Sequence, residues 1–405
     1  MDRQYSMFLF QKRTIPEEKA MDWMYLVYFL LAAALFFGCK AYGRGEWNEE
    51  YTSLGQSKVL QGALVLGVAL HHMAQKSCAP WHKPIYIVHG LDFFVPIGYL
   101  FVSAFFFCSG LGLYKSLKTK PDYLRGFIRK RILPLVAAFY LSEFVCLAVR
   151  LLMGQKMDAL TVLWYASGLH MANENSWYLI AIPFFYLAFY FAFRFCRREG
   201  FAIFWVFVFT LAYTVFGASL EHQNDWWMRG EWWYNSVLLF PLGLLFGKHE
   251  AKTTAFFKKA YWLLLPVSFA GIFLSNRLFG IVEGKWGYYN EWDKLMIVHR
   301  LATAASQWLV CIFFTAFLLL LMLKVRFGNR VLRWLGGMTL SFYLMHGIFV
   351  EMFGYNFLDV APSLTYIRSV PLFMLAVLCC SVPAALLFNW LWQGVTNRFI
   401  RRKAQ

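Results

Sequence analysis

The residues best suited to chemistry are two adjacent histidines near the end of an apolar stretch, His71 and His72 in LVLGVALHHMAQK. A neutral imidazole accepts protons near physiological pH, so histidine often serves as a general base or nucleophile. Adjacent residues lie about 100° apart around a helix, so at most one of the two can face a given cavity. The other interpretation is a histidine at the membrane interface, bonded to a neighbouring helix.

Other ionisable side chains also lie within apolar segments, where they are candidates for function because charge is costly in lipid. Glu143 is in mid-segment, and Arg150 follows it two turns later, so a structural ion pair explains it as well as catalysis does. His346 lies in LSFYLMHGIF, with Glu351 after it. Arg131 directly precedes the apolar segment 132–153. It is either a residue of the site or a charge that sets the membrane topology.

Composition places these residues in an integral membrane protein, because 60% of the 405 residues are hydrophobic and only 15% are charged. Apolar runs of roughly 20 residues recur, enough to cross a bilayer as helices. The sequence therefore predicts an all-α, polytopic transmembrane bundle. Its eleven expected helices are 24–42, 58–76, 92–114, 132–153, 177–195, 201–219, 234–248, 260–279, 300–323, 335–353 and 370–395. The stretch 160–170 is too short to span and is expected to be re-entrant or interfacial.

The net charge is +17, and the basic residues that produce it lie mainly in the loops between the expected helices. Lysine and arginine gather in every second loop and in the C-terminal tail, a pattern that indicates cytoplasmic loops and membrane-lipid contacts rather than a nucleic-acid partner. The C-terminus is then cytoplasmic and the N-terminus is outside. A helix that begins near Lys58 on the cytoplasmic side carries His72 roughly 20 Å across the membrane, past its midplane.

The eight cysteines have neither the spacing of metal ligands nor that of a disulfide framework. No phosphate-binding loop, GxSxG or HExxH motif occurs in its proper context. We therefore expect no bound metal or cofactor.

Several stretches together resemble the acyltransferase-3 family of integral-membrane acyltransferases over about residues 55–395. In order they are SKVLQGALVLGVALHHM (57–73), FVSAFFFCSGLGLYKS (101–116), FIRKRILPL (127–135), NSWYLIAIPFFYLAFYF (175–191), LLFPLGLLFGKHE (238–250) and WLGGMTLSFYLMHGIFV (334–350). The resemblance implies a ten-helix core in residues 55–405. Residues 1–54 then form an N-terminal segment with one extra transmembrane helix.

The resemblance implies transfer of an acyl group, usually acetyl, from cytoplasmic acyl-CoA to a hydroxyl of a cell-surface or lipid-linked glycan in a bacterial plasma membrane. His72 would be the general base or the acyl acceptor, and Gln61, Ser109 or a backbone N–H would stabilise the oxyanion. The phosphates of coenzyme A, a co-substrate, call for a basic dock. The candidate residues for binding donor or substrate are Lys58, Ser109, Arg129, Lys130, Arg131, Glu143 and His346.

The chain departs from the family pattern at Gln61, where the first core helix normally carries an arginine with ten residues between it and the histidine. A glutamine can donate a hydrogen bond but has no charge to pair with a phosphate. Either Lys58 or Arg131 supplies that charge, or donor binding and activity are lost. Ile128 similarly replaces an arginine three residues before Arg131.

Two other classes of function compete with the transferase. A transporter or exporter of a glycan, lipid or small molecule would also use an intramembrane histidine, for proton coupling. A membrane scaffold or sensor would tolerate the loss of His71, His72 and Arg131. If the protein is a transferase, its acceptor can also be a small amphipathic molecule or a lipid. A glycan acceptor is expected to be handled by a separate extracytoplasmic partner.

Overall fold

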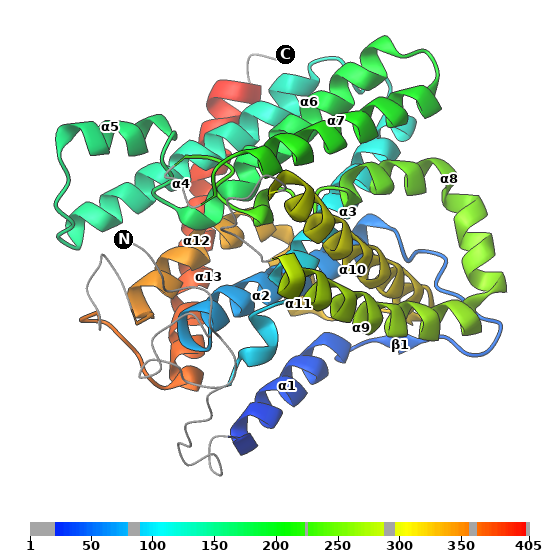
Figure 1. The fold of residues 1–405 in the computed structure, drawn as a ribbon, viewed down its shortest axis with the longest axis horizontal. Coiled ribbons are helices and arrows are strands. Elements are labelled where there is room, and N and C mark those ends of the chain that lie inside the picture. Colours follow the sequence, from blue (N-terminus) through cyan, green and yellow to red (C-terminus); the bar gives the residue numbers. More distant parts are fainter. Residues whose placement is uncertain (1–20, 80–89, 223–225, 287–295, 356–362, 402–405) are drawn as a thin grey trace.

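The fold is described by a computed structural model for residues 21–79, 90–222, 226–286, 296–355 and 363–401. Within these residues the protein is all-α, as predicted, apart from one antiparallel pairing of β1 (Lys40–Ala41) with β2 (Val325–Arg326). Thirteen α-helices are present in this part of the chain (Figure 1). They are α1 (Met21–Phe36), α2 (Leu54–Ser77), α3 (Gly98–Thr119), α4 (Leu133–Leu152), α5 (Ala159–Ser167), α6 (Trp177–Phe195), α7 (Glu199–Ser219), α8 (Leu239–Lys259), α9 (Tyr261–Trp286), α10 (Met296–Lys324), α11 (Arg330–Gly337), α12 (Thr339–Phe353) and α13 (Val370–Val395).

Each of the eleven helices expected from hydropathy corresponds to a helix of the structure, and α5 and α11 are additional short ones. In the described residues, seven helices are long and apolar enough to cross a membrane: α3, α4, α6, α7, α9, α10 and α13. The remaining four expected helices, α1, α2, α8 and α12, are shorter or more polar. The chain is thus an integral membrane protein built as a helical bundle.

Several predicted boundaries differ from the structure by four residues or more, and local backbone conformation explains three of the differences. The first helix ends at Phe36, because Gly38 has a φ of 71° and β1 follows. The helix expected at 335–353 is interrupted at Met338, after two glycines, so α11 and α12 are separate. The helix expected at 234–248 begins at Leu239 and continues to Lys259 through a kink at His249, visible in Figure 1.

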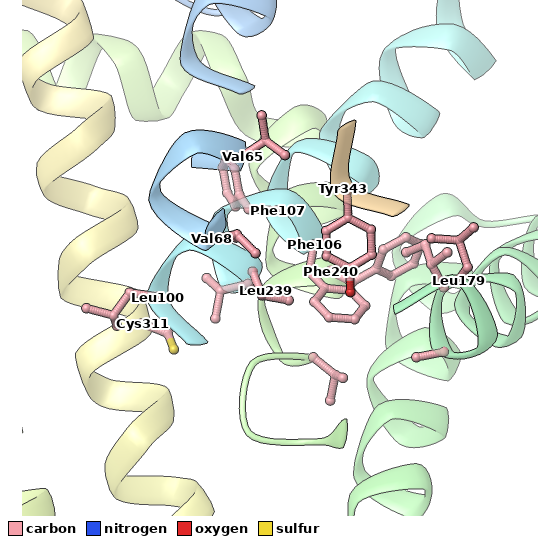
Figure 2. Close-up of a cluster of buried hydrophobic side chains, with 14 of the residues drawn as sticks. Val65, Val68, Leu100, Phe106, Phe107, Leu179, Leu239, Phe240, Cys311 and Tyr343 are labelled. Carbon is pink, nitrogen blue, oxygen red and sulfur yellow. The ribbon is translucent and has the colours of Figure 1, made fainter. Parts of the chain in front are cut away.

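Helix α2 is the element around which the site is built, since it contacts α3, α11, α12 and α13. Its N-cap Ser53 accepts a hydrogen bond from the Gln56 backbone N–H, which defines the start of the helix. Nearly half of its positions are buried, and most of these are small or aliphatic residues. Figure 2 shows Val65 and Val68 of α2 packing into a cluster with Phe106 and Phe107 of α3 and Tyr343 of α12.

One end of the bundle carries a network of ion pairs, and we call it the basic face. Lys118 at the end of α3 pairs with Glu199 at the start of α7 at 2.8 Å, and Lys115 pairs with Glu250 of α8 at 2.8 Å. The start of α4 is at the same end as the end of α13, because Trp392 Nε1 donates to the Pro134 carbonyl. The sequence predicts that this face is cytoplasmic.

Candidate active site

The structure brings together two histidines that are 274 positions apart in the sequence. His72 of α2 and His346 of α12 meet with 2.8 Å between His72 Nδ1 and His346 Nε2. Their rings are nearly parallel, with an interplanar angle of 1°. His346 is fully buried, whereas His72 keeps part of its surface accessible. His72 is therefore the member of the pair that a substrate can reach.

Hydrogen-bond geometry assigns the protons of this pair in its neutral form. His346 Nδ1 lies 3.1 Å from the carbonyl oxygen of Phe342, which can only accept, so Nδ1 carries the proton. His346 Nε2 is then an acceptor, and His72 Nδ1 must be the donor to it. The remaining nitrogen, His72 Nε2, holds a free lone pair. An orienting group behind a basic imidazole is the arrangement that catalytic triads use.

His71 has a different role from its neighbour, as their angular separation on the helix predicted. Its Nδ1 lies 2.8 Å from the carbonyl oxygen of Phe94, in the 3₁₀ turn Asp92–Phe94 before α3. Its ring lies so close to Gly98 that a Cβ there would overlap it. His71 therefore holds the start of α3 against α2.

The next contact between α2 and α12 is an ion pair. Lys76 Nζ lies 2.7 Å from a Glu351 carboxylate oxygen, one turn beyond the histidines and further from the basic face. About a quarter of each side chain is exposed. Two successive polar contacts thus join the same pair of helices, and both constrain their register.

Glu143 is buried and supports the segment before α6 rather than reaching the histidines. Its carboxylate accepts hydrogen bonds from the Ala172 and Asn173 backbone N–H groups and from the Ser176 hydroxyl, at 2.5 to 3.3 Å. Arg150 donates to the Ala172 carbonyl at 3.0 Å. Both charged side chains therefore hold the same segment and form no direct ion pair in the described residues, whereas the sequence left an ion pair and a catalytic role open.

This segment in turn contacts the helix of His346. Asn173 Nδ2 donates to the Leu344 carbonyl of α12 at 2.9 Å. Asn175 lies against Gly347, where a Cβ would overlap its amide nitrogen. Glu143 thus supports α12 indirectly, through two asparagines.

A series of polar side chains, one guanidinium and four hydroxyls, runs from the basic face toward the histidine pair, and we call it the polar row. Ser109 Oγ lies 3.3 Å from the Tyr178 hydroxyl. Tyr186 is close to Ser109 and within electrostatic range of Arg131. The Tyr178 and Tyr343 rings are 6.1 Å apart, and the Tyr343 and His346 rings are 6.0 Å apart. The members of the row are Arg131, Tyr186, Ser109, Tyr178 and Tyr343.

Tyr343 differs from the other members because its hydroxyl is buried without a hydrogen-bond partner among the described residues. Figure 2 shows this ring in the same buried cluster as Phe106 and Phe240. A buried hydroxyl without a partner is unfavourable by about 1–3 kcal/mol, so the Tyr343 hydroxyl is available to hydrogen-bond a substrate. Sequence reasoning overlooked Tyr178 and Tyr343. The available signal was the three-residue spacing of Tyr343 and His346, which places both on one face of a helix.

Gln61 and Lys58 lie toward the other end of α2, and the basic candidates Arg129, Lys130 and Arg131 lie before α4. The structure does not bring these five residues to the histidines. Gln61 precedes His72 by eleven residues on one helix, about 16 Å along the axis. Lys58 is exposed, one turn nearer the basic face. Arg131 lies in the π-helical turn Ile128–Ile132 before α4, with its guanidinium carbon 5.6 Å from the Tyr123 ring centre. Arg129 and Lys130 flank it.

A membrane bundle with an oriented histidine inside and a basic face at one end has the parts that a group-transfer enzyme needs. Comparison with protein families shows which class this is. The model of the acyltransferase-3 family, described as an acyltransferase domain, matches residues 54–390. The chain belongs to this family and is a membrane acyltransferase. No curated protein and no solved structure matches it.

Proposed function

We propose that this acyltransferase moves an acetyl group from acyl-CoA, held at the basic face, to a hydroxyl of a cell-surface or lipid-linked glycan. In this proposal the basic face is cytoplasmic in a bacterial plasma membrane, and the glycan comes from the opposite side. The observation that carries it is the His72–His346 pair, whose hydrogen bonds leave the lone pair of His72 Nε2 free.

The reaction needs a base and then an acid, and His72 Nε2 serves as both. It takes the proton of the acceptor hydroxyl as that oxygen attacks the thioester carbonyl carbon. The C–S bond then breaks, and the sulfur leaves as coenzyme A thiol with the proton from His72. His346 stabilises the transient imidazolium by accepting the Nδ1–H hydrogen bond. If the acetyl group first bonds to His72, the same nitrogen is the nucleophile.

The oxyanion needs a hydrogen-bond donor near His72. Gln61 is about 16 Å along α2 from His72, so we assign it to the donor end of the path. Tyr343 is the member of the polar row whose ring contacts His346, one turn further along α12, and its hydroxyl has no hydrogen-bond partner among the described residues. We therefore assign the oxyanion contact to Tyr343. Ser109 and Tyr178 would hydrogen-bond the arm that carries the thioester.

The acceptor site is supported by a small pocket beside α12. It lies between α4, α12 and the segment before α6, and its polar lining includes Arg150, Asn173, Glu174, Asn175 and Glu351. Gly347, next to His346, is also part of the lining. The pocket has a volume of about 20 Å³, so its amide and carboxylate groups suit a single hydroxyl of the acceptor. A separate extracytoplasmic partner would present that acceptor.

The experiment that tests this function follows acetyl groups in membranes. Membranes containing the wild type or His72→Ala receive acetyl-CoA labelled on the acetyl group, and label is measured in the glycan and lipid fractions. We expect label transfer in the wild type and a loss of between a hundredfold and ten-thousandfold in His72→Ala, the range typical of a general base. The amount of protein inserted is measured in both membrane preparations and must be equal.

Two results would overturn the proposal. Full transfer by His72→Ala would remove the histidine from the chemistry. No consumption of any acyl-CoA by correctly inserted wild type, across a range of donors and acceptors, would favour a carrier. The labelled fraction in a positive experiment identifies the acceptor.

A further inference from the structure

A second site lies on the basic face, away from the polar row. It is an open groove of about 730 Å³ between the α6–α7 junction and α8. Its lining consists of Arg197, Arg198, Gly200, Phe201, Phe204 and Lys248. One wall is therefore cationic and the other aromatic, and the acyl-transfer chemistry described above uses neither.

The cations of the groove differ from their neighbours in having no partner. Elsewhere on the basic face Lys115 and Lys118 are held in ion pairs at 2.8 Å. Arg197, Arg198 and Lys248 form no hydrogen bond or ion pair in the part of the chain that the structure describes. Glu199 attracts Lys248 at longer range, but none of the three cations forms an ion pair among the described residues. Three such positive charges around one groove indicate a site for an anion.

The acidic residue nearest these cations is already engaged. Glu199, at the start of α7, accepts from Lys118 Nζ with one oxygen and from the Tyr114 hydroxyl with the other, at 2.8 and 2.7 Å. Its carboxylate is thus turned toward α3. It leaves the cations of the groove available to a ligand.

The backbone adds to the positive character of the groove. Arg198 is the N-cap of α7, and its side chain makes no capping hydrogen bond. The first N–H groups of a helix without such a cap favour an anion. Lys248 Nζ lies over this helix start, 2.9 Å from the position that a Cβ of Gly200 would occupy. The absence of a side chain at Gly200 lets the ammonium group reach the turn.

The aromatic wall identifies the rest of the ligand. Phe201 and Phe204 are about half exposed, and their rings are stacked with centres 6.0 Å apart. Trp205, also half exposed, lies edge-on to both rings. Since α7 is a membrane-spanning helix, these exposed rings face lipid rather than the protein interior.

We propose that this groove binds the headgroup phosphate of an anionic phospholipid, with the acyl chains against Phe201 and Phe204. Phosphate bound by arginine and lysine at the membrane surface, with apolar chains beside it, matches both walls. Coenzyme A also carries phosphates, so it shares the chemistry of the headgroup. It does not account for the lipid-facing aromatic rings. This inference does not depend on the identity of the acyl acceptor.

The test measures lipid binding by the full chain. Purified protein in neutral detergent is titrated with phosphatidylglycerol, phosphatidylcholine and, separately, coenzyme A, and bound molecules are counted by native mass spectrometry. The test variant is Arg197→Gln/Arg198→Gln/Lys248→Gln. Its matched control is Arg194→Gln/Lys252→Gln/Lys259→Gln, which removes three exposed or nearly exposed charges of the same face outside the groove.

We expect the wild type and the control to retain phosphatidylglycerol in preference to phosphatidylcholine. The groove variant should bind phosphatidylglycerol roughly tenfold or more weakly, because it loses charge-assisted hydrogen bonds to phosphate. Equal weakening in the control would mean general surface charge, and would overturn the proposal. If the groove variant bound phosphatidylglycerol as the wild type does but bound coenzyme A more weakly, the proposal would be overturned. The groove would then be a nucleotide site. An unchanged circular dichroism spectrum shows that each variant is folded.

Discussion

Helix α2 meets α11 and α12 in two very different ways. Toward the basic face, Gly62 of α2 and Gly336 of α11 bring two backbones into direct contact. Toward the opposite face, His72 and His346 meet through their side chains at 2.8 Å. The glycine contact sets the distance between the helices, and the histidine contact depends on that distance.

The glycine contact is reciprocal. A Cβ at Gly62 would overlap the Leu332 carbonyl oxygen, and a Cβ at Gly336 would overlap that of Lys58. Backbone atoms cannot move aside as a flexible side chain does, so even one methyl group must separate the helices. Small residues at such positions are typical of close packing between membrane helices.

The largest expected effect comes from breaking the glycine contact. Gly62→Ala should lower the free energy of unfolding by about 1–3 kcal/mol through overpacking and also abolish acyl transfer, because His346 moves away from His72. Gly112→Ala on α3 is the matched control, since a Cβ there meets no atom within 4 Å. Removing a helix glycine at that position should be neutral or stabilising by up to about 1 kcal/mol.

Thermal unfolding in detergent and label transfer in membranes measure these two effects. If Gly62→Ala kept both the melting temperature and the activity of the wild type, the glycine contact would not set the position of the histidines.

The second prediction leaves the helix spacing intact and changes only the hydrogen bond between the rings. His346→Leu removes the acceptor for His72 Nδ1–H, so His72 can adopt the wrong tautomer, and the turnover number should fall on the order of a thousandfold. His346→Gln offers a side-chain oxygen that can accept the same hydrogen bond. It should therefore recover much of the lost turnover.

The contrast between these two variants separates positioning from packing. Turnover by the two variants is compared at equal protein amounts and across pH. Because leucine fills the site with an apolar group and glutamine with a polar one, a purely structural role predicts leucine to be the better tolerated. Greater activity in His346→Leu than in His346→Gln would contradict the tautomer assignment.

Much of the fold could be predicted from local sequence, because long apolar runs determine where helices form. The eleven expected helices therefore have counterparts in the structure, while the break at Met338 and the kink at His249 are changes of backbone conformation that a hydropathy window does not report. In the site, His72 and His346 stood out separately as polar residues in apolar segments. Their contact joins positions 274 residues apart and requires the glycine spacing, which a single sequence does not reveal.

Tyr343 shows why the rest of the site was hidden. A tyrosine in an apolar helix has the pattern of a core residue, and its ring does pack in the core (Figure 2). Its functional signal is the unpaired hydroxyl, which becomes apparent once the neighbours in space are known. Residues that combine packing with chemistry are thus the hardest to recognise from sequence.

The smallest of these effects is expected from Tyr343→Phe, which removes one oxygen atom and keeps the ring. If the hydroxyl stabilises the oxyanion, the turnover number should fall about a hundredfold with little change in the KM for acyl-CoA. Stability should stay equal or rise slightly, because a buried hydroxyl without a partner disappears.

The control is Tyr213→Phe, since the Tyr213 hydroxyl also has no partner among the described residues but its ring packs against Phe185 and Phe209, away from the histidines. Both variants should gain the same small amount of stability, and only Tyr343→Phe should lose turnover. Equal turnover in the two variants would show that the Tyr343 hydroxyl neither contacts the substrate nor stabilises the oxyanion. The glycine contact and the histidine pair would then define the site by themselves, with the oxyanion donor to be sought among backbone N–H groups.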